Sequence, residues 1–165
     1  MDRTAQNVYL SAEYAEAIRY MDNANDTLQK ARKDGKHYID RKYVRTACGT
    51  AYNGVLIALD AWFALKELPK LSKKQRKSIE YYMKSIATID KKMVAYLGTA
   101  YHILHLDGYY DGETSVKAIE VGFDAAYEII EKIKPEQFVE VKETRGQGLK
   151  RVLNNLLISA AVMFR

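Results

Sequence analysis

The segment from Tyr101 to Ser115 gathers more side chains able to hold a metal or move a proton than any other part of the 165-residue chain. It reads YHILHLDGYYDGETS and contains two of the three histidines, His102 and His105, together with Asp107 and Asp111. Histidines three positions apart share one face of an α-helix, so they could act as two ligands of one metal. A metal would need further ligands from another helix, but the apolar faces expected on the other helices contain no Glu-x-x-His motif of the kind that binds iron in di-iron proteins. We therefore expect no metal and no cofactor, with both histidines beside the core near a helix end.

Two other reactive residue types are better explained by the core. Cys48, the single cysteine, lies on a stripe of large apolar residues, where burial raises a thiol pKa and removes the thiolate that a nucleophile needs. Most of the 13 tyrosines also fall on or beside apolar stripes. Tyr109 and Tyr110 differ, because the turn expected at 107–113 has little core to hold them. We predict that these two tyrosines contact a ligand or a partner.

Basic side chains cluster around the expected turn between the first two helices. They are Lys30, Arg32, Lys33, Lys36, Arg41, Lys42 and Arg45. The last three follow the expected start of a helix, where the backbone amides also attract negative charge. The pattern predicts an anion or ligand site formed by Arg41, Lys42 and Arg45 with Tyr109 and Tyr110.

Acidic side chains are expected beside this basic cluster. In an up-and-down bundle the first and third turns lie at the same end, which places Asp107, Asp111 and Glu113 near the arginines. The carboxylates are therefore predicted to compete with any external anion for the same cations.

The elements that position these residues are predicted to be helices almost throughout, because the chain has only two prolines and few alternating runs. The first covers about 4–33 and ends at Asp34-Gly35, and the second runs from an N-cap at Asp40 to about Lys66. The second helix carries a stripe of large apolar residues beside a stripe of small ones. It is therefore expected at the centre of the fold.

Two further helical regions are expected before residue 135. The apolar stripe of the third begins at Ile79 and persists to about Leu106, with a bend or break marked by Ser85 and Thr88. The fourth follows the turn at 107–113 and ends against Pro135.

The fold class predicted from these stripes is all-α, an up-and-down four-helix bundle with an additional C-terminal helix. Residues 1–135 are assigned to the bundle and 136–165 to a C-terminal extension. The amphipathic helix of this extension, Leu149–Phe164, has apolar residues on more than one side. It is expected to belong to the same domain or to a dimer interface, and homodimerisation is the favoured state.

Composition narrows the class of protein. One domain with a single core is expected from the length and from a hydrophobic content of 48%. The lone cysteine and the acidic residues near the start of the chain favour the cytoplasm, and no apolar run reaches the roughly 18 residues that would cross a bilayer. The net charge of +5 leaves nucleic acid open as a partner, without favouring it over a protein.

The chain also resembles a known class of proteins. The run DRKYVRTACGTAYNGVLIALDAWFALK, followed by AYHILHLDGYYDG and another helix, is similar to an uncharacterised family of small bacterial helical proteins of HEPN-like type. The resemblance covers about residues 10–134. It implies a four-helix bundle, often dimeric, that acts either as a metal-independent ribonuclease or as a non-catalytic interaction and binding module.

Active members of the HEPN class share an arginine and a later histidine with four to six residues between them. No arginine precedes His102 or His105 at that spacing, and the spacing occurs once, between Arg32 and His37. The resemblance therefore favours a binding module that is not an enzyme. The alternatives are a ribonuclease that uses Arg32 and His37, or His102 and His105, and an RNA-binding protein without catalysis.

Overall fold

The computed structural model describes residues 2–68 and 77–136, and these form an all-α fold with one very short β-hairpin. The α-helices are α1 (Arg3–Gln29), α2 (Arg41–Leu65), α3 (Ile79–Ala87), α4 (Lys91–Ala100) and α5 (Val116–Ile130). A π-helix, η1 (Tyr101–Asp111), continues α4, and a 3-10 turn, η2 (Glu131–Ile133), continues α5. The predicted all-α class is confirmed. The predicted C-terminal helix lies outside the described residues.

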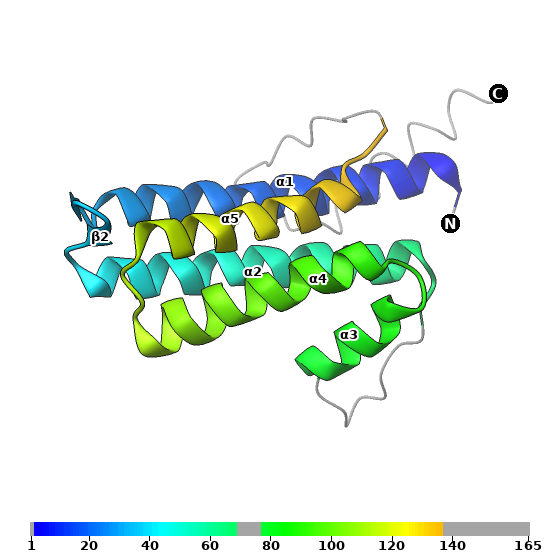
Figure 1. The fold of residues 1–165 in the computed structure, drawn as a ribbon. Coiled ribbons are helices and arrows are strands. Elements are labelled where there is room, and N and C mark those ends of the chain that lie inside the picture. The colour runs from blue at the N-terminus through cyan, green and yellow to red at the C-terminus, as the bar shows by residue number, and fades with distance from the viewer. Residues whose placement is uncertain (1, 69–76, 137–165) are drawn as a thin grey trace.

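The long helices lie roughly parallel or antiparallel to one another, and the chain reverses direction between successive ones (Figure 1). The short helix α3 lies apart from them, at the end of the molecule opposite the β-hairpin. We call the end formed by the hairpin, the start of α2 and residues 107–116 the hairpin end.

Helix α2 is the central element, as its two apolar stripes predicted. It packs against α1, α5, η1 and η2. The stripe of small residues lets α1 approach closely, since a Cβ at Gly54 would lie only 3.2 Å from the Ala17 carbonyl oxygen. By length and composition α2 could also cross a membrane, but 56% of its most apolar window is buried inside the protein. Its apolar character therefore has an explanation within the fold.

The hairpin joins α1 to α2 through a short turn. Strands β1 (Lys33–Asp34) and β2 (His37–Tyr38) pair antiparallel around Gly35, which adopts a left-handed φ of 58°. Asp40 caps α2 as predicted, because its carboxylate accepts a hydrogen bond from the Lys42 amide at 3.0 Å.

The third helical region differs from the continuous stripe that the sequence shows. Helix α3 ends at Ala87, and α4 starts anew behind Asp90, whose side chain accepts from the Met93 amide at 2.9 Å. The predicted break near Thr88 is therefore present. The predicted turn starting at Asp107 is wrong in its position, because the helix continues in π geometry to Asp111.

Candidate functional site

The hairpin end is held together by backbone hydrogen bonds between segments far apart in the sequence. The Tyr38 amide donates to the Thr114 carbonyl oxygen at 2.8 Å, and the Val116 amide donates to the Lys36 carbonyl oxygen at 2.9 Å. His37 also forms a bridge with Ser115. These bonds fix the start of α5 against β2, and with it the position of the acidic residues that precede α5.

Two arginines of α2 pack directly on the left-handed residue that ends the π-helix. Gly112 has φ of 72° and is buried, and a Cβ there would lie 2.6 Å from Cδ of Arg41 and 2.7 Å from Nε of Arg45. Only glycine meets both conditions, the positive φ and the lack of space. Gly112 therefore sets the distance between the arginine pair and the end of η1.

A hollow of about 250 Å³ lies beside this contact. It is lined by Arg41, Asp107, Asp111, Gly112, Glu113 and Thr114. Within residues 2–68 and 77–136, neither Arg41 nor Arg45 makes a direct ion pair. One Glu113 oxygen is already engaged, because Oε1 accepts from the amides of Thr114 at 2.7 Å and Ser115 at 2.6 Å. Arg41 thus shares the hollow with three acidic residues without pairing directly with any of them.

An aromatic cluster forms the adjoining surface of η1 and α2. The His105 ring stacks on Tyr52 at a centroid distance of 4.7 Å and on Tyr101 at 5.3 Å, and it meets Tyr110 edge-on at 5.1 Å. Burial lowers the pKa of His105 and raises that of Tyr52 to about 12. Burial therefore favours the uncharged form of both the His105 and the Tyr52 ring.

Tyr109 and Tyr110 form the exposed edge of the aromatic cluster. Their rings lie 5.0 Å apart, with 44% and 59% of the two residues exposed. Tyr109 lies over Gly49 of α2, where a Cβ would come within 3.0 Å of its ring. Both tyrosines remain accessible to a ligand, although they belong to a helix and not to the turn expected from the sequence.

The two histidines of this segment have different environments, contrary to the shared face expected for an α-helix. In a π-helix each hydrogen bond spans five residues instead of four, so residues three apart no longer align. His102 is exposed, whereas His105 is half-buried in the aromatic cluster. In the described part of the chain, no three His, Cys, Asp or Glu side chains are grouped so that they could hold a metal ion.

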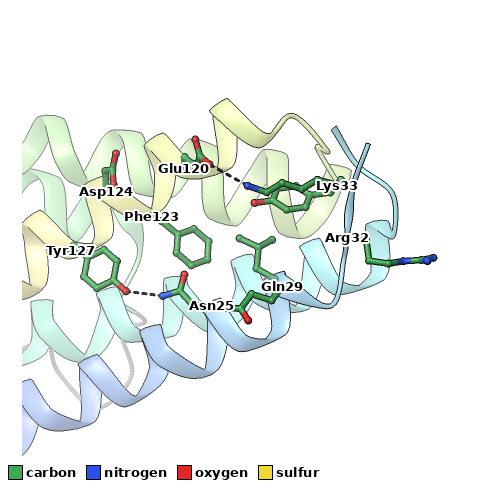
Figure 2. A pocket seen from close by; sticks show the side chains of 10 residues that line it. Asn25, Gln29, Arg32, Lys33, Glu120, Phe123, Asp124 and Tyr127 are labelled. Atoms are coloured by element: carbon green, nitrogen blue, oxygen red, sulfur yellow. Dashed lines mark hydrogen bonds and ion pairs between the residues drawn. The ribbon is translucent and has the colours of Figure 1, made fainter. Parts of the chain in front are cut away.

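The other arginine–histidine combination, Arg32 and His37, lies on the hairpin. His37 Nδ1 is 3.3 Å from the Thr114 hydroxyl, on the side of the hairpin that contacts α5. Arg32 adopts a φ of 49°, and its side chain points away from the protein (Figure 2). No hydrogen bond or ring contact of the described chain joins these two side chains.

Cys48 lies beneath the π-helix. It is fully buried, and burial raises its pKa to about 12. A Cβ at Gly108 would lie 2.5 Å from its Sγ atom and 2.9 Å from the Ile103 carbonyl oxygen. Cys48 is thus a core residue, as the apolar stripe predicted. The absence of a side chain at Gly108 allows η1 to pack on it.

A second hollow was not anticipated from the sequence. It has a volume of about 380 Å³ and lies between α1 and α5 next to the hairpin (Figure 2). Its lining residues are Asn25, Leu28, Gln29, Arg32, Lys33, Tyr38, Glu120, Phe123, Asp124 and Tyr127. Apolar periodicity identifies which face of each helix is buried, but it does not show that two neighbouring helices stay apart.

The seam between α1 and α5 is joined mainly by polar side chains, because the two helices make sparse direct contact. Polar links cross from α1 and β1 to α5 and the residues that follow it. They include Arg3–Glu136 at 2.7 Å, Tyr14–Glu131 at 2.8 Å, Asn25–Tyr127 at 2.8 Å and Lys33–Glu120 at 3.5 Å. The hollow occupies the part of the seam that the last two links border.

Comparison with known proteins places the chain in a family. Residues 12–135 match the family described as Domain of unknown function (DUF5618). The chain belongs to this family. The matched range contains the hairpin end and the α1–α5 hollow, so both are features of the DUF5618 domain.

A solved structure supports the fold of the DUF5618 domain. It is a protein of unknown function from Dyadobacter fermentans that is 36% identical to this chain, with a TM-score of 0.68. The match covers 76% of this chain and 97% of the other. No curated protein matches the chain. The likeness therefore supports an uncharacterised helical family, as the sequence suggested, and brings no activity with it.

Proposed function

We propose that this DUF5618 protein is a non-catalytic, HEPN-like four-helix module that binds an anionic group of a partner at its hairpin end. The group would lie against Arg41, Lys42 and Arg45, with Tyr109 and Tyr110 covering its less polar part. The observation that carries the proposal is that Arg41 and Arg45 are fixed against Gly112 without a direct ion pair in the described chain.

The electrostatics of this end favour an anion that can displace weakly held carboxylates. Arg41 is the first residue of α2, where the helix dipole adds positive potential that the capping carboxylate of Asp40 offsets in part. Arginine also offers a planar fork of donors that fits a carboxylate or a phosphate. Asp107 and Asp111 line the same hollow without pairing directly, so they tune the affinity and do not block the cations.

The exposed aromatic edge gives the proposed site its second component. Tyrosines are enriched in binding interfaces because they bury a large area at little cost in conformational entropy. Ile39, which is 54% exposed, lies at the same end just before α2. These apolar side chains support association with a protein, and we propose that the module acts as a homodimer.

Copurification tests the proposed binding function. Tagged full-length protein would be recovered from its own cells as wild type, as R41Q/R45Q and as the charge-matched control K84Q/K91Q. Lys84 and Lys91 are exposed on α3 and α4, away from the hairpin end. We expect one anionic partner with the wild type and the control, and its loss with R41Q/R45Q. Equal recovery by all three proteins would refute the role of the arginines.

The ribonuclease alternative is tested separately. Purified protein would be incubated with structured RNA in the presence of a chelator, because the expected chemistry needs no metal. Our proposal expects no cleavage above that of a mock preparation. Cleavage by the wild type that is lost in H37A, or in H102A/H105A, would show that the protein is a ribonuclease and would refute the proposal of a non-catalytic module. Binding of the RNA without cleavage, sensitive to R41Q/R45Q, would identify RNA as the anionic partner.

A further inference from the structure

The hollow between α1 and α5 has the form of a small-molecule site separate from the hairpin-end arginines. Its volume of about 380 Å³ lies within the range usual for ligand pockets, roughly 300–1,000 Å³. Phe123 and Leu28 supply an apolar floor and are 6% and 8% exposed. Figure 2 shows the Phe123 ring between the two helices, with polar side chains around it. This pattern of an apolar floor with a few polar groups is typical of a binding site.

The charged side chains around the hollow come from two segments of the chain. Lys33 comes from the hairpin, whereas Glu120 and Asp124 come from successive turns of α5. The Lys33 ammonium is 3.5 Å from Glu120 Oε1, and both side chains are about half exposed. Such an exposed pair is weakly held, and Lys33 also lies 5.4 Å from the centre of the Tyr38 ring. The pair can therefore open without a large loss of stability.

The uncharged groups close the opposite end of the hollow. The Asn25 amide donates to the Tyr127 hydroxyl at 2.8 Å, and Gln29 lies one turn further along α1. Amide and hydroxyl groups can donate and accept, so they suit a polar ligand without selecting one sign of charge. The selection by charge then depends on Lys33 and the two carboxylates.

From this arrangement we propose that the α1–α5 hollow binds a small zwitterion of the α-amino-acid type. The ligand inserts between Lys33 and Glu120, with its carboxylate on Lys33 and its ammonium on Glu120 and Asp124. Its apolar side chain lies on Phe123 and Leu28. A ligand with one charge can pair with only one side of the opened ion pair, whereas a zwitterion makes a charge contact with each side.

Matched ligands test this charge requirement. L-phenylalanine, phenethylamine and 3-phenylpropionate share a ring and differ in which charges they carry. Each would be titrated into ¹⁵N-labelled full-length protein while amide chemical shifts are recorded. We expect L-phenylalanine to give saturable shifts confined to 25–33, Tyr38 and 120–127, and each single-charge analogue to bind at least about tenfold more weakly. L-leucine, titrated in the same way, should shift the same amides.

Variants connect the shifts to the proposed contacts. K33Q and E120Q should each weaken L-phenylalanine binding about tenfold, whereas K117Q, an exposed change on the same helix, should leave it unchanged. The unperturbed part of each spectrum reports whether the variant is folded. The proposal is overturned if neither amino acid gives saturable shifts below about 10 mM, if the analogues bind equally well, or if the shifts centre on Arg41 and Arg45.

Discussion

Replacement of Gly108 by alanine should destabilise the protein, because the π-helix lies directly on Cys48 at this residue. The added Cβ would be 2.5 Å from Cys48 Sγ, 2.8 Å from Cys48 Cβ and 2.9 Å from the Ile103 carbonyl oxygen. One of these atoms belongs to the backbone, so rotation of a side chain cannot relieve every contact. Overpacking of this kind costs about 1–3 kcal/mol.

The helical preference of alanine offsets part of this loss. Alanine is favoured over glycine in a helix interior by up to about 1 kcal/mol, which leaves G108A destabilised by about 1–2 kcal/mol. Gly98 provides the control, because a Cβ there would meet only the Met83 methyl group, at an ordinary 3.7 Å. G98A should therefore be unchanged or more stable by up to about 1 kcal/mol.

Urea and thermal unfolding followed by circular dichroism would measure the difference between the two variants. A gap of about 1–3 kcal/mol corresponds to melting temperatures roughly 2–12 °C apart for a chain of this size. In the double variant G108A/C48A the loss should be smaller than the sum of the single losses, because the Sγ contact is gone. If G108A melts as high as G98A, η1 does not pack on Cys48 as described.

Three further predictions concern titratable groups. Cys48, whose pKa is raised by burial to about 12, should react with a thiol reagent at the rate of unfolding, and fast labelling in native buffer would contradict its position. The pKa of His105 is lowered by burial below the usual 6.5, so native stability should decrease as pH falls through 6.5, and this decrease should be absent in H105Q. The pKa of Asp90 is lowered from 3.8 by its hydrogen bond with Lys132, so the ionised carboxylate stabilises the folded state above pH 3.8 and this stabilisation is lost on further acidification. The free energy of unfolding of D90N should therefore depend less steeply on pH in acid. An unchanged pH profile would argue against the hydrogen bond.

Local signals in the sequence predicted the elements well. Asp40 has the side chain of an N-cap and precedes an apolar stripe, and it caps α2 in the structure. The stripe of small residues beside the large ones predicted a central helix, and α1 packs closely on α2 at Gly54. Each of these predictions depends on residues within one or two helical turns, where the sequence pattern and the geometry are directly related.

The π-helix could not be predicted in the same way. An α-helix and a π-helix can bury the same apolar side chains, so the apolar stripe that persists to about Leu106 does not distinguish the two. The difference nevertheless decides the site, since it separates His102 from His105 and brings Tyr109 over Gly49. Glycines at 49 and 108 were the available signal, because each permits a close approach between η1 and α2.

The α1–α5 hollow depends on an arrangement of whole helices. Asn25 and Gln29 border the stripe of α1, as surface residues of an amphipathic helix normally do. Nothing in their spacing shows that α5 stands far enough away to leave a hollow. The tyrosine that Asn25 contacts lies 102 residues later in the chain, beyond the reach of any periodicity.

The polar seam between α1 and α5 also bears on how the protein opens in solution. Breaking Arg3–Glu136, Tyr14–Glu131 and Asn25–Tyr127 exposes little apolar surface, whereas separating α1 from α2 would expose Ala17, Met21 and Ala24, which are fully buried. The opening of lowest free energy should therefore part the seam and leave α1 packed on α2. Native-state hydrogen exchange would then show the core amides of α1 and α2 in one class, because both helices are exposed by the same large opening. The seam can thus open and close while α1 and α2 stay folded as one unit.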